Sequence, residues 1–487
     1  MTLSFDPDDI ALTAGHFING ALVPAEGVIA MKRPSDGKDF AACPRADAAC
    51  VDSAVESAGK ALRNSNWGGL HPRERTKLMH RFADLIESEA HTLAKLEAVC
   101  STRPVGHLVD GDIAITAEQI RFFAEFADKE GSALVPTDDS NLGMIVTEPY
   151  GVVGAITPWN FPLNMAGWKL GPALAAGNAV VMKPSEMTPF STLYLAELAV
   201  RAGIPAGLFN VVLGDGPVTG TAITGHPDIA KVSFTGSTAA GSAIMANIAR
   251  TGVKPMTLEL GGKSPQIVFA DADLDKAAAA IASGILSNAG QACVAGSRLI
   301  VHESVAEALA AAIIARMKAV TPGPTWDSAT HYPPIISERQ IDRIHAIVTA
   351  AVAAGGECLT GGGMMDGPGY FYRPTLIANV DPSSPAVIEE IFGPVLTMQT
   401  FSDEEEAMAL ADHPSYGLAA GLYTNDLSRA LRLSRGLQAG TVWVNRYNRS
   451  RDHILPTGGY RQSGIGKDLG REAYLANRKS KSVLIAL

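Results

Sequence analysis

A single cysteine with glycines on both sides is the first candidate for chemistry in this chain. Cys293 lies between Gly290 and Gly296, after an alanine-rich segment that predicts a helix. Glycine has no Cβ, so the backbone of such a segment can approach a ligand closely. The thiol is a candidate nucleophile, although a lone cysteine is more often a small buried core residue. The other four cysteines are interpreted as core residues: Cys43, Cys50, Cys100 and Cys358.

Two further polar residues stand inside apolar segments. Glu259 lies between two leucines and before two glycines, so its carboxylate is either desolvated, with a raised pKa suited to a general base, or turned to solvent. Asn160 follows an apolar strand and has Trp159 and Phe161 on its two sides. Its amide could donate a hydrogen bond to an oxyanion, or it could serve a turn.

The segment 234–241 follows strand-like residues 231–233 and opens a predicted helix. Backbone N–H groups at such a helix start can hold a phosphate. The glycine spacing differs from the G-x-G-x-x-G fingerprint of the common dinucleotide fold, so the pattern alone is weak.

Alternating strands and helices must position these residues. Apolar strand-like runs at 151–156, 179–182 and 209–213 alternate with a helix-like segment at 192–202, which predicts a doubly wound α/β sheet. A second alternating block runs over 264–445. Its predicted helices are 274–287 and 305–320, and its predicted strands are 298–301 and 441–445. An amphipathic helix is predicted over 72–99.

Composition excludes several classes of protein. Apolar residues make up 47% of the 487 residues, which supplies a packed interior. The formal charge of −10 argues against nucleic-acid binding. The five cysteines include no CxxC pair, so we expect neither a disulfide framework nor a metal site. No secretory signal and no long uninterrupted apolar run is found, so we expect a soluble, cytoplasmic protein that does not enter a membrane.

Taken together, the motifs resemble the NAD(P)-dependent aldehyde dehydrogenase superfamily, of the hydrolytic, acid-forming type, nearly from end to end. The matching segments, in order, are 16–20, 158–162, 183–186, 234–238, 258–265, the Cys293 loop, 389–395 and 458–466. The resemblance implies that Cys293 attacks the aldehyde carbon to give a thiohemiacetal and then a thioester. It also implies that the Asn160 amide and the Cys293 N–H hold the oxyanion, and that Glu259 activates the water that hydrolyses the thioester.

Two alternatives remain beside this interpretation. Relatives that transfer the acyl group to coenzyme A usually lack the carboxylate that Glu259 supplies. A non-catalytic structural relative would be expected to have lost Cys293, Glu259 or Asn160, and all three are present.

The resemblance also implies a cofactor site. Lys183 and Glu186 match residues that contact the adenosine ribose, and a carboxylate there would repel a 2′-phosphate, so NAD is favoured over NADP. Gly236 and Ser237 match the pyrophosphate contacts, whereas Glu390 and Phe392 match residues at the nicotinamide ribose and ring. The other expected cofactor contacts are Ile156, Thr157, Pro158, Trp159, Ser185, Gly216, Phe234 and Leu260.

The substrate is expected to be a small-molecule aldehyde, polar or a semialdehyde. Thr457 replaces an aromatic that is frequent in the family's tunnel wall, while Phe161 and Trp168 match other wall positions. The loop 446–453 matches the substrate-facing loop and carries three arginines, of which Arg451 is the candidate partner for a substrate carboxylate. Asp452 could instead receive an amine, and a solvated loop or a subunit contact is the remaining alternative.

The fold implied by the resemblance has two doubly wound α/β domains, one Rossmann-like for the cofactor and one catalytic, plus a small β bridging element. The expected NAD-binding domain is 1–129 with 150–261, the catalytic domain is 262–465, and the bridging or oligomerisation element is 130–149 with 466–487. The apolar strand at 480–485 is expected to pair with a neighbouring subunit, which predicts a homodimer or homotetramer.

Overall fold

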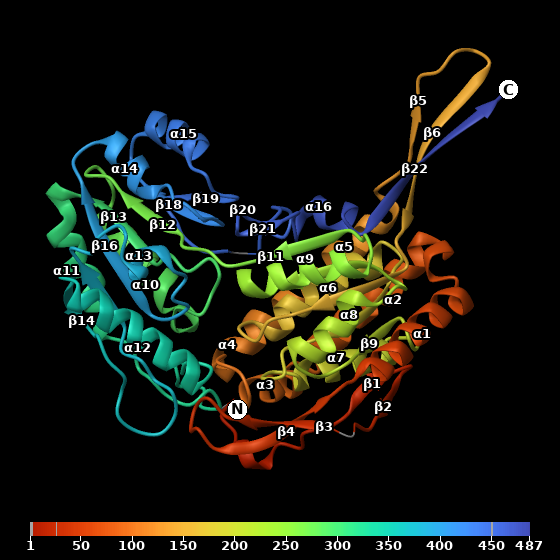
Figure 1. Cartoon of the computed structure of the whole chain (residues 1–487), viewed down its shortest axis with the longest axis horizontal. Coiled ribbons are helices and arrows are strands. Elements are labelled where there is room, and N and C mark those ends of the chain that lie inside the picture. The colour runs from red at the N-terminus through yellow and green to blue at the C-terminus, as the bar shows by residue number, and fades with distance from the viewer. Residues whose placement is uncertain (1–2, 26, 450) are drawn as a thin grey trace.

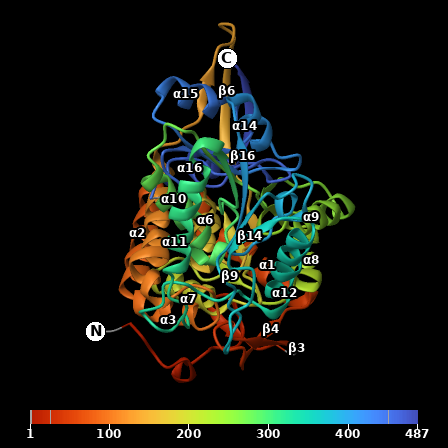
Figure 2. The same ribbon diagram turned by 90° about the vertical axis from the view of Figure 1, so that its left-hand side faces the viewer.

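The computed structural model describes residues 3–25, 27–449 and 451–487. Two α/β units lie side by side, and a narrow antiparallel sheet projects away from both (Figure 1). The turned view shows the N-terminal ribbon of β3 (Gly27–Lys32) and β4 (Asp39–Arg45) at the end opposite to this projection (Figure 2). The predicted fold class, two doubly wound α/β units with a small β element, is confirmed.

The first unit is built on an eight-stranded sheet with a parallel centre. Its strands, in spatial order, are β2 (Ala21–Val23), β1 (His16–Ile18), β9 (Phe209–Val211), β8 (Ala179–Lys183), β7 (Val152–Ile156), β10 (Ile229–Thr235), β11 (Met256–Glu259) and β21 (Gly464–Ile465). Strands β7 and β8 are buried along their whole length, as expected for parallel strands covered on both faces. The helices of this unit are α1 (Ala48–Ser65), α2 (Pro72–Ser88), α3 (Ala90–Ala98), α4 (Val105–His107), α5 (Ala114–Ala124), α6 (Pro162–Ala175), α7 (Phe190–Arg201), α8 (Thr221–Gly225) and α9 (Thr238–Thr251).

The second unit has a seven-stranded sheet. Its order is β14 (Glu357–Thr360), β15 (Thr375–Ala378), β16 (Val395–Phe401), β13 (Arg298–His302), β12 (Pro265–Val268), β18 (Ala419–Tyr423) and β19 (Thr441–Val444), and only the edge pair β14–β15 is antiparallel. Its helices are α10 (Leu274–Leu286), α11 (Ala306–Lys318), α12 (Glu338–Ala353), α13 (Pro385–Ile388), α14 (Glu404–Ala411) and α15 (Leu427–Gly436). The short strands β17 (Tyr416–Gly417) and β20 (Tyr460–Arg461) pair beside it.

The projecting sheet consists of β5 (Ala133–Val135), β6 (Asn141–Pro149) and β22 (Arg478–Ala486), all antiparallel. The C-terminal segment assigned to the bridging element, 466–487, contains helix α16 (Gly470–Leu475) as well as strand β22. Helix α16 packs on the first unit, where the ring of Tyr474 stacks on Phe126 at 5.6 Å between centroids. In addition, β21, which falls in our expected catalytic segment, pairs with β11 of the first sheet.

The single helix predicted over 72–99 is two helices. The backbone leaves helical geometry at Glu89 (φ −100°, ψ 16°), which ends α2 and begins α3. The Glu89 carboxylate accepts a hydrogen bond from Arg201 at 2.7 Å, so this break is tied to the end of α7. Among the described residues, no helix is both long and apolar enough to cross a membrane.

Candidate active site

The candidate residues converge where the chain passes from one sheet to the other. Glu259 is the last residue of β11 in the first sheet, and Pro265 begins β12 in the second. Asn160 follows the carboxyl end of β7, and Cys293 follows α10 of the second unit. The fold thus brings a carboxyl, an amide and a thiol to the junction of the two units.

Side chains of the Cys293 loop hold this loop in place through hydrogen bonds to neighbouring segments. Asn288 and Ala289 have positive φ values of 50° and 51°, so the chain turns sharply after α10. The Asn288 amide donates to the carbonyl of Asn160 at 3.0 Å, which ties this loop to the segment after β7. Gln291 donates to the carbonyl of Pro334 at 3.1 Å and accepts from the N–H of Ile336 at 2.9 Å. The sequence reasoning missed Asn288 and Gln291, because polar loop residues carry no distinctive pattern.

Cys293 is half-buried, and its thiol lies in an environment that opposes ionisation. Burial raises the pKa of Cys293 to about 12, the charge of Arg449 lowers it, and the carboxylates of Glu390 and Glu259 raise it further. Because a thiolate is the nucleophilic form, this thiol needs a proton acceptor or an added positive charge at the moment of attack.

The Asn160 side chain is buried with one amide proton to spare. Its Nδ2 donates to the carbonyl of Gln291 at 3.0 Å, and this bond uses one of the two amide protons. Within the described ranges, no acceptor receives the backbone N–H of Cys293. Two hydrogen-bond donors beside Cys293 are therefore free to bind an oxygen atom of a ligand.

Glu259 is a buried carboxyl with only 5% of its surface exposed. Burial raises the pKa of Glu259 to about 8; the charge of Asp468 raises it as well, and the cations of Lys169, Arg449 and Lys467 lower it. In the described part of the chain its Oε1 has no hydrogen-bond partner. A carboxyl that titrates near neutral pH and has a free oxygen is suited to take a proton from water.

Gly458 makes the space for this carboxyl. A Cβ at position 458 would lie 2.9 Å from Glu259 Oε1, and the residue has a φ of +148°. Any side chain here would be strained and would displace the Glu259 oxygen.

A buried ion pair, also missed by the sequence reasoning, lies close to Glu259. Lys169 Nζ of α6 lies 2.8 Å from Asp468 Oδ2, and both side chains are buried. A lysine inside the largely apolar α6 was the available signal, since a buried cation needs a partner.

The expected adenosine end of the cofactor site holds a lysine and a glutamate together. Lys183 Nζ donates to the carbonyls of Gly214 at 2.7 Å and Pro184 at 3.0 Å, and it lies 3.6 Å from Glu186 Oε2. The Glu186 carboxylate is only partly covered. It is therefore the group that a ribose hydroxyl could reach first.

The segment expected to contact the cofactor phosphates opens helix α9. Ser237 caps α9, its Oγ accepting from the N–H of Ala240 at 3.2 Å. The N–H of Gly236, however, donates to the carbonyl of Glu259 at 3.0 Å, so it is already used inside the protein. Open space surrounds Gly216, and Thr157 Oγ1 is buried without a partner among the described residues, two features that fit a bound dinucleotide.

The expected nicotinamide end is held by glycines and by Gln340 of α12, whose amide donates to the carbonyls of Ile391 and Phe392 at 3.0 Å. Glu390 Oε1 accepts from the N–H of Gly262 at 2.9 Å, and a Cβ on Gly261 would lie 2.3 Å from Glu390 Oε2. Burial raises the pKa of Glu390 to about 7. The Phe392 ring meets Trp159 edge-on at 5.4 Å between centroids.

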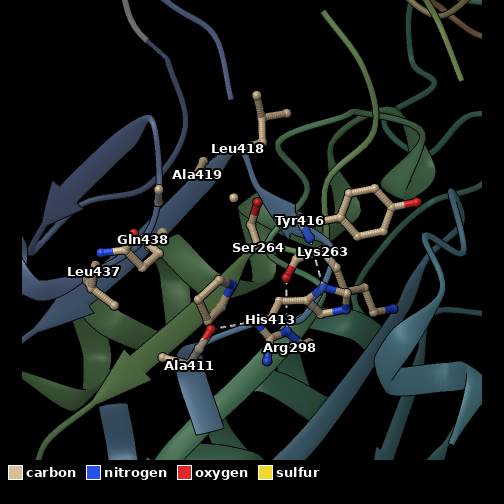
Figure 3. Close-up of a pocket in the computed structure, with 14 residues that line it drawn as sticks. Lys263, Ser264, Arg298, Ala411, His413, Tyr416, Leu418, Ala419, Leu437 and Gln438 are labelled. Atoms are coloured by element: carbon tan, nitrogen blue, oxygen red, sulfur yellow. Dashed lines mark hydrogen bonds between the residues drawn. The ribbon is translucent and has the colours of Figure 1, made fainter. Parts of the chain in front are cut away.

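Behind this segment, Lys263 and Ser264 line a cavity of about 10 Å³ with Arg298 and His413 (Figure 3). Arg298 Nε donates to the carbonyl of Lys263 at 2.9 Å. Lys263 Nζ and Ser264 Oγ are buried without partners in the described ranges, and the cavity is about the size of one water molecule. The cavity is therefore a place where one water molecule could bond these two buried polar atoms.

The expected substrate wall contains an arginine other than Arg451. The Arg449 guanidinium lies 5.1 Å from the centre of the Trp168 ring and donates to Thr457 Oγ1. Arg451 instead donates to Glu118 of α5 at 2.7 Å and to the carbonyl of Asp110 at 3.2 Å. The structure therefore brings Arg449, Thr457 and Trp168 together and directs Arg451 toward α5.

Phe161, the remaining residue expected in the substrate wall, is held by Arg103. The Arg103 guanidinium lies 4.6 Å from the centre of its ring and is ion-paired with Asp112 at 2.6 Å. This contact fixes the aromatic ring directly after Asn160.

Comparison with known proteins agrees with this arrangement. The model of the aldehyde dehydrogenase family matches residues 23–483. The chain is 40% identical over 481 residues to the NADP/NAD-dependent aldehyde dehydrogenase PuuC of Escherichia coli, covering 98% of this chain and 97% of the relative.

Solved structures give the same result. An indole-3-acetaldehyde dehydrogenase in complex with NAD⁺ superposes with a TM-score of 0.96 at 39% identity, covering 99% of this chain and 98% of the other. The NAD⁺ complex of an aldehyde dehydrogenase from Bacillus cereus has a TM-score of 0.96 at 38% identity and covers 100% of both chains. The chain therefore belongs to the aldehyde dehydrogenase family.

Proposed function

We propose that this protein oxidises an aldehyde to the carboxylic acid with NAD, by covalent catalysis at Cys293 and hydrolysis assisted by Glu259. The observation that carries the proposal is the convergence of the thiol, the spare Asn160 amide proton and the free Glu259 oxygen at the junction of the two sheets. NAD is supported by the family and by the two related structures that contain NAD⁺.

The chain's own groups account for the proton and charge changes of this reaction. The Cys293 thiol gives its proton to the Glu259 carboxylate or to solvent, and its sulfur forms a bond to the aldehyde carbon while the π electrons of the C=O bond move to the oxygen. The Asn160 amide and the Cys293 N–H then stabilise the oxyanion, and each such donor is worth roughly 100- to 1,000-fold in rate. NAD, when bound, supplies the hydride acceptor. Glu259 takes a proton from the water that attacks the resulting thioester, so the acid leaves and the thiol is restored.

The buried carboxyl supports hydrolysis over the coenzyme A alternative. A thioester that waits for coenzyme A would be lost to water activated by a carboxylate next to it, and Gly458 leaves Glu259 the space it needs. A non-catalytic structural role is disfavoured because Cys293, Glu259 and Asn160 are all present and grouped.

The proposal is tested with purified protein, an aldehyde panel, and NAD, NADP or NAD with coenzyme A. We expect NADH formation with release of the free acid and no stimulation by coenzyme A. Acyl-coenzyme A as the product would favour the alternative reaction, and complete inactivity of a folded, cofactor-binding protein would refute the enzymatic role.

Glu186 is proposed to set the preference for NAD over NADP. Its partly exposed carboxylate would accept hydrogen bonds from ribose hydroxyls and repel a 2′-phosphate. We expect Glu186→Gln to raise the NADP/NAD ratio of kcat/KM by about tenfold, because roughly 1.4 kcal/mol of repulsion corresponds to that factor. Steady-state kinetics with both cofactors measures the ratio. The exposed Glu197 of α7, changed to Gln, is the matched control, and an unchanged ratio in Glu186→Gln would exclude this role.

The projecting sheet is proposed to join subunits into a homodimer or homotetramer. Leu484 of the edge strand β22 is 68% exposed, and exposed apolar edges favour pairing with another chain. We expect Leu484→Asp to shift the protein from oligomer to monomer, as measured by light scattering after gel filtration. Leu427 on α15 is 72% exposed, and Leu427→Asp should leave the oligomer intact. An oligomer that persists in Leu484→Asp would assign assembly to another surface.

A further inference from the structure

We infer that Arg449 selects aldehydes that carry a carboxylate at the end remote from the reacting carbon. The inference rests on the proposed function, since it names the substrate class of that same site. Arg449 belongs to the loop that follows β19, and its guanidinium is held between the Trp168 ring and Thr457 Oγ1. Two wall positions therefore fix its direction.

Arg449 differs from the other arginines of its loop in lacking an acidic partner. Arg446 lies 3.8 Å from Asp452, and Arg451 lies 2.7 Å from Glu118. Among the described residues, no carboxylate lies within ion-pair distance of Arg449, although burial is sufficient to lower the pKa of its guanidinium. The guanidinium is partly buried, and the charges of Glu259 and Asp468 act on it from beyond ion-pair distance. A substrate carboxylate at ion-pair distance would be the direct partner that this cation lacks.

The guanidinium acts on the reacting groups themselves. Its positive charge stabilises the thiolate of Cys293 and the carboxylate of Glu259, so it lies within Coulombic reach of both. Thr457, which it contacts, immediately precedes the glycine that faces the Glu259 oxygen. A substrate held by Arg449 is thereby held close to the attacking sulfur.

The chemistry of the site favours a carboxylate over the other charged groups. The planar guanidinium fork matches a carboxylate with two parallel hydrogen bonds, and the bond to Thr457 uses one of its five N–H groups. An amine would be repelled by the same charge. A phosphate carries nearly two negative charges, and a single unpaired guanidinium beside the Glu259 carboxyl compensates it poorly.

The test compares two aldehydes of equal chain length, succinate semialdehyde and butanal, in wild type and loop variants. We expect Arg449→Met to lower the ratio of their kcat/KM values by about 30-fold or more, mainly through KM for the semialdehyde. Arg449→Lys keeps the charge but loses the planar pair of N–H donors, so its ratio of kcat/KM values should lie between those of wild type and Arg449→Met. Arg446→Met is the matched control and should keep the wild-type ratio.

Three outcomes would overturn the inference. These are an unchanged ratio in Arg449→Met, an equal loss with both aldehydes, and a collapse of the ratio in Arg451→Met instead. A fourth comparison tests a phosphate as the recognised group. If the enzyme prefers glyceraldehyde 3-phosphate over glyceraldehyde more strongly than succinate semialdehyde over butanal, the anion selected by Arg449 is a phosphate and not a carboxylate.

A binding measurement separates this inference from the proposed function. Succinate, titrated into the protein by calorimetry, should bind wild type and lose affinity in Arg449→Met whether or not the enzyme turns over. Arg449-dependent succinate binding in a protein that oxidises no aldehyde would refute the proposed function alone. Turnover of aldehydes without such binding would refute the inference alone.

Discussion

Replacement of Cys293 by alanine is expected to lower aldehyde-dependent NADH formation by at least about 10,000-fold, because the only covalent nucleophile of the proposed mechanism is removed. The fold should persist, since the side chain is small and half-buried in a loop fixed by Asn288 and Gln291. The measurement is NADH formation under substrate saturation, with NAD binding followed in parallel by calorimetry. Retained NAD binding would show that chemistry alone was lost.

Cys358 offers the matched control. Its thiol is exposed on the edge strand β14 of the second unit, and Cys358→Ala should keep wild-type turnover. Substantial NADH formation by Cys293→Ala would contradict covalent catalysis at this residue. Loss of activity in both variants would point to general sensitivity of the protein to cysteine replacement.

The sheets were predictable from sequence because their strands are short apolar runs with a local signature. The runs at 151–156 and 179–182 correspond to β7 and β8, both wholly buried, and the predicted helix 305–320 corresponds to α11. The prediction failed where a tertiary contact decides a local break. The amphipathic pattern continues across Glu89, yet the chain bends there, and a salt bridge to Arg201 accompanies the bend.

In the candidate site, too, residues with a local sequence signature were predictable and those positioned by tertiary contacts were not. Short motifs locate Cys293, Glu259 and Asn160, since each lies in a segment whose backbone is set by neighbouring glycines or prolines. The direction of a loop arginine has no such local signature. Arg451, the arginine predicted to contact substrate, bonds to Glu118 of α5, which is distant in sequence, whereas Arg449 lies over the ring of Trp168. The Lys169–Asp468 pair joins residues almost 300 positions apart, so no local pattern in the sequence could predict it.

Glu259→Gln is expected to separate the two halves of the proposed reaction. The amide keeps the size of the side chain against Gly458 but cannot accept a proton from water, so we expect steady-state turnover to fall by roughly 100- to 10,000-fold. A rapid burst of NADH equal to the number of active sites should remain, because the thioester forms and then persists. Stopped-flow absorbance measures the burst, and mass spectrometry detects the acylated Cys293. The exposed Glu357, changed to Gln, serves as the control that should leave both phases unaltered.

The pH dependence of this variant gives the sharper test of the base. Burial raises the pKa of Glu259 to about 8, so the carboxylate that accepts the proton is scarce at pH 6 and abundant at pH 9. Where hydrolysis of the thioester limits wild-type turnover, kcat should therefore rise with pH and level off above about 8. Glu259→Gln should lose this rise, since its amide does not titrate. A variant that kept the rising limb would assign it to another group, with the Cys293 thiol, whose pKa burial raises to about 12, as the first candidate. Loss of the burst together with turnover would instead place the main role of Glu259 in deprotonating that thiol before attack.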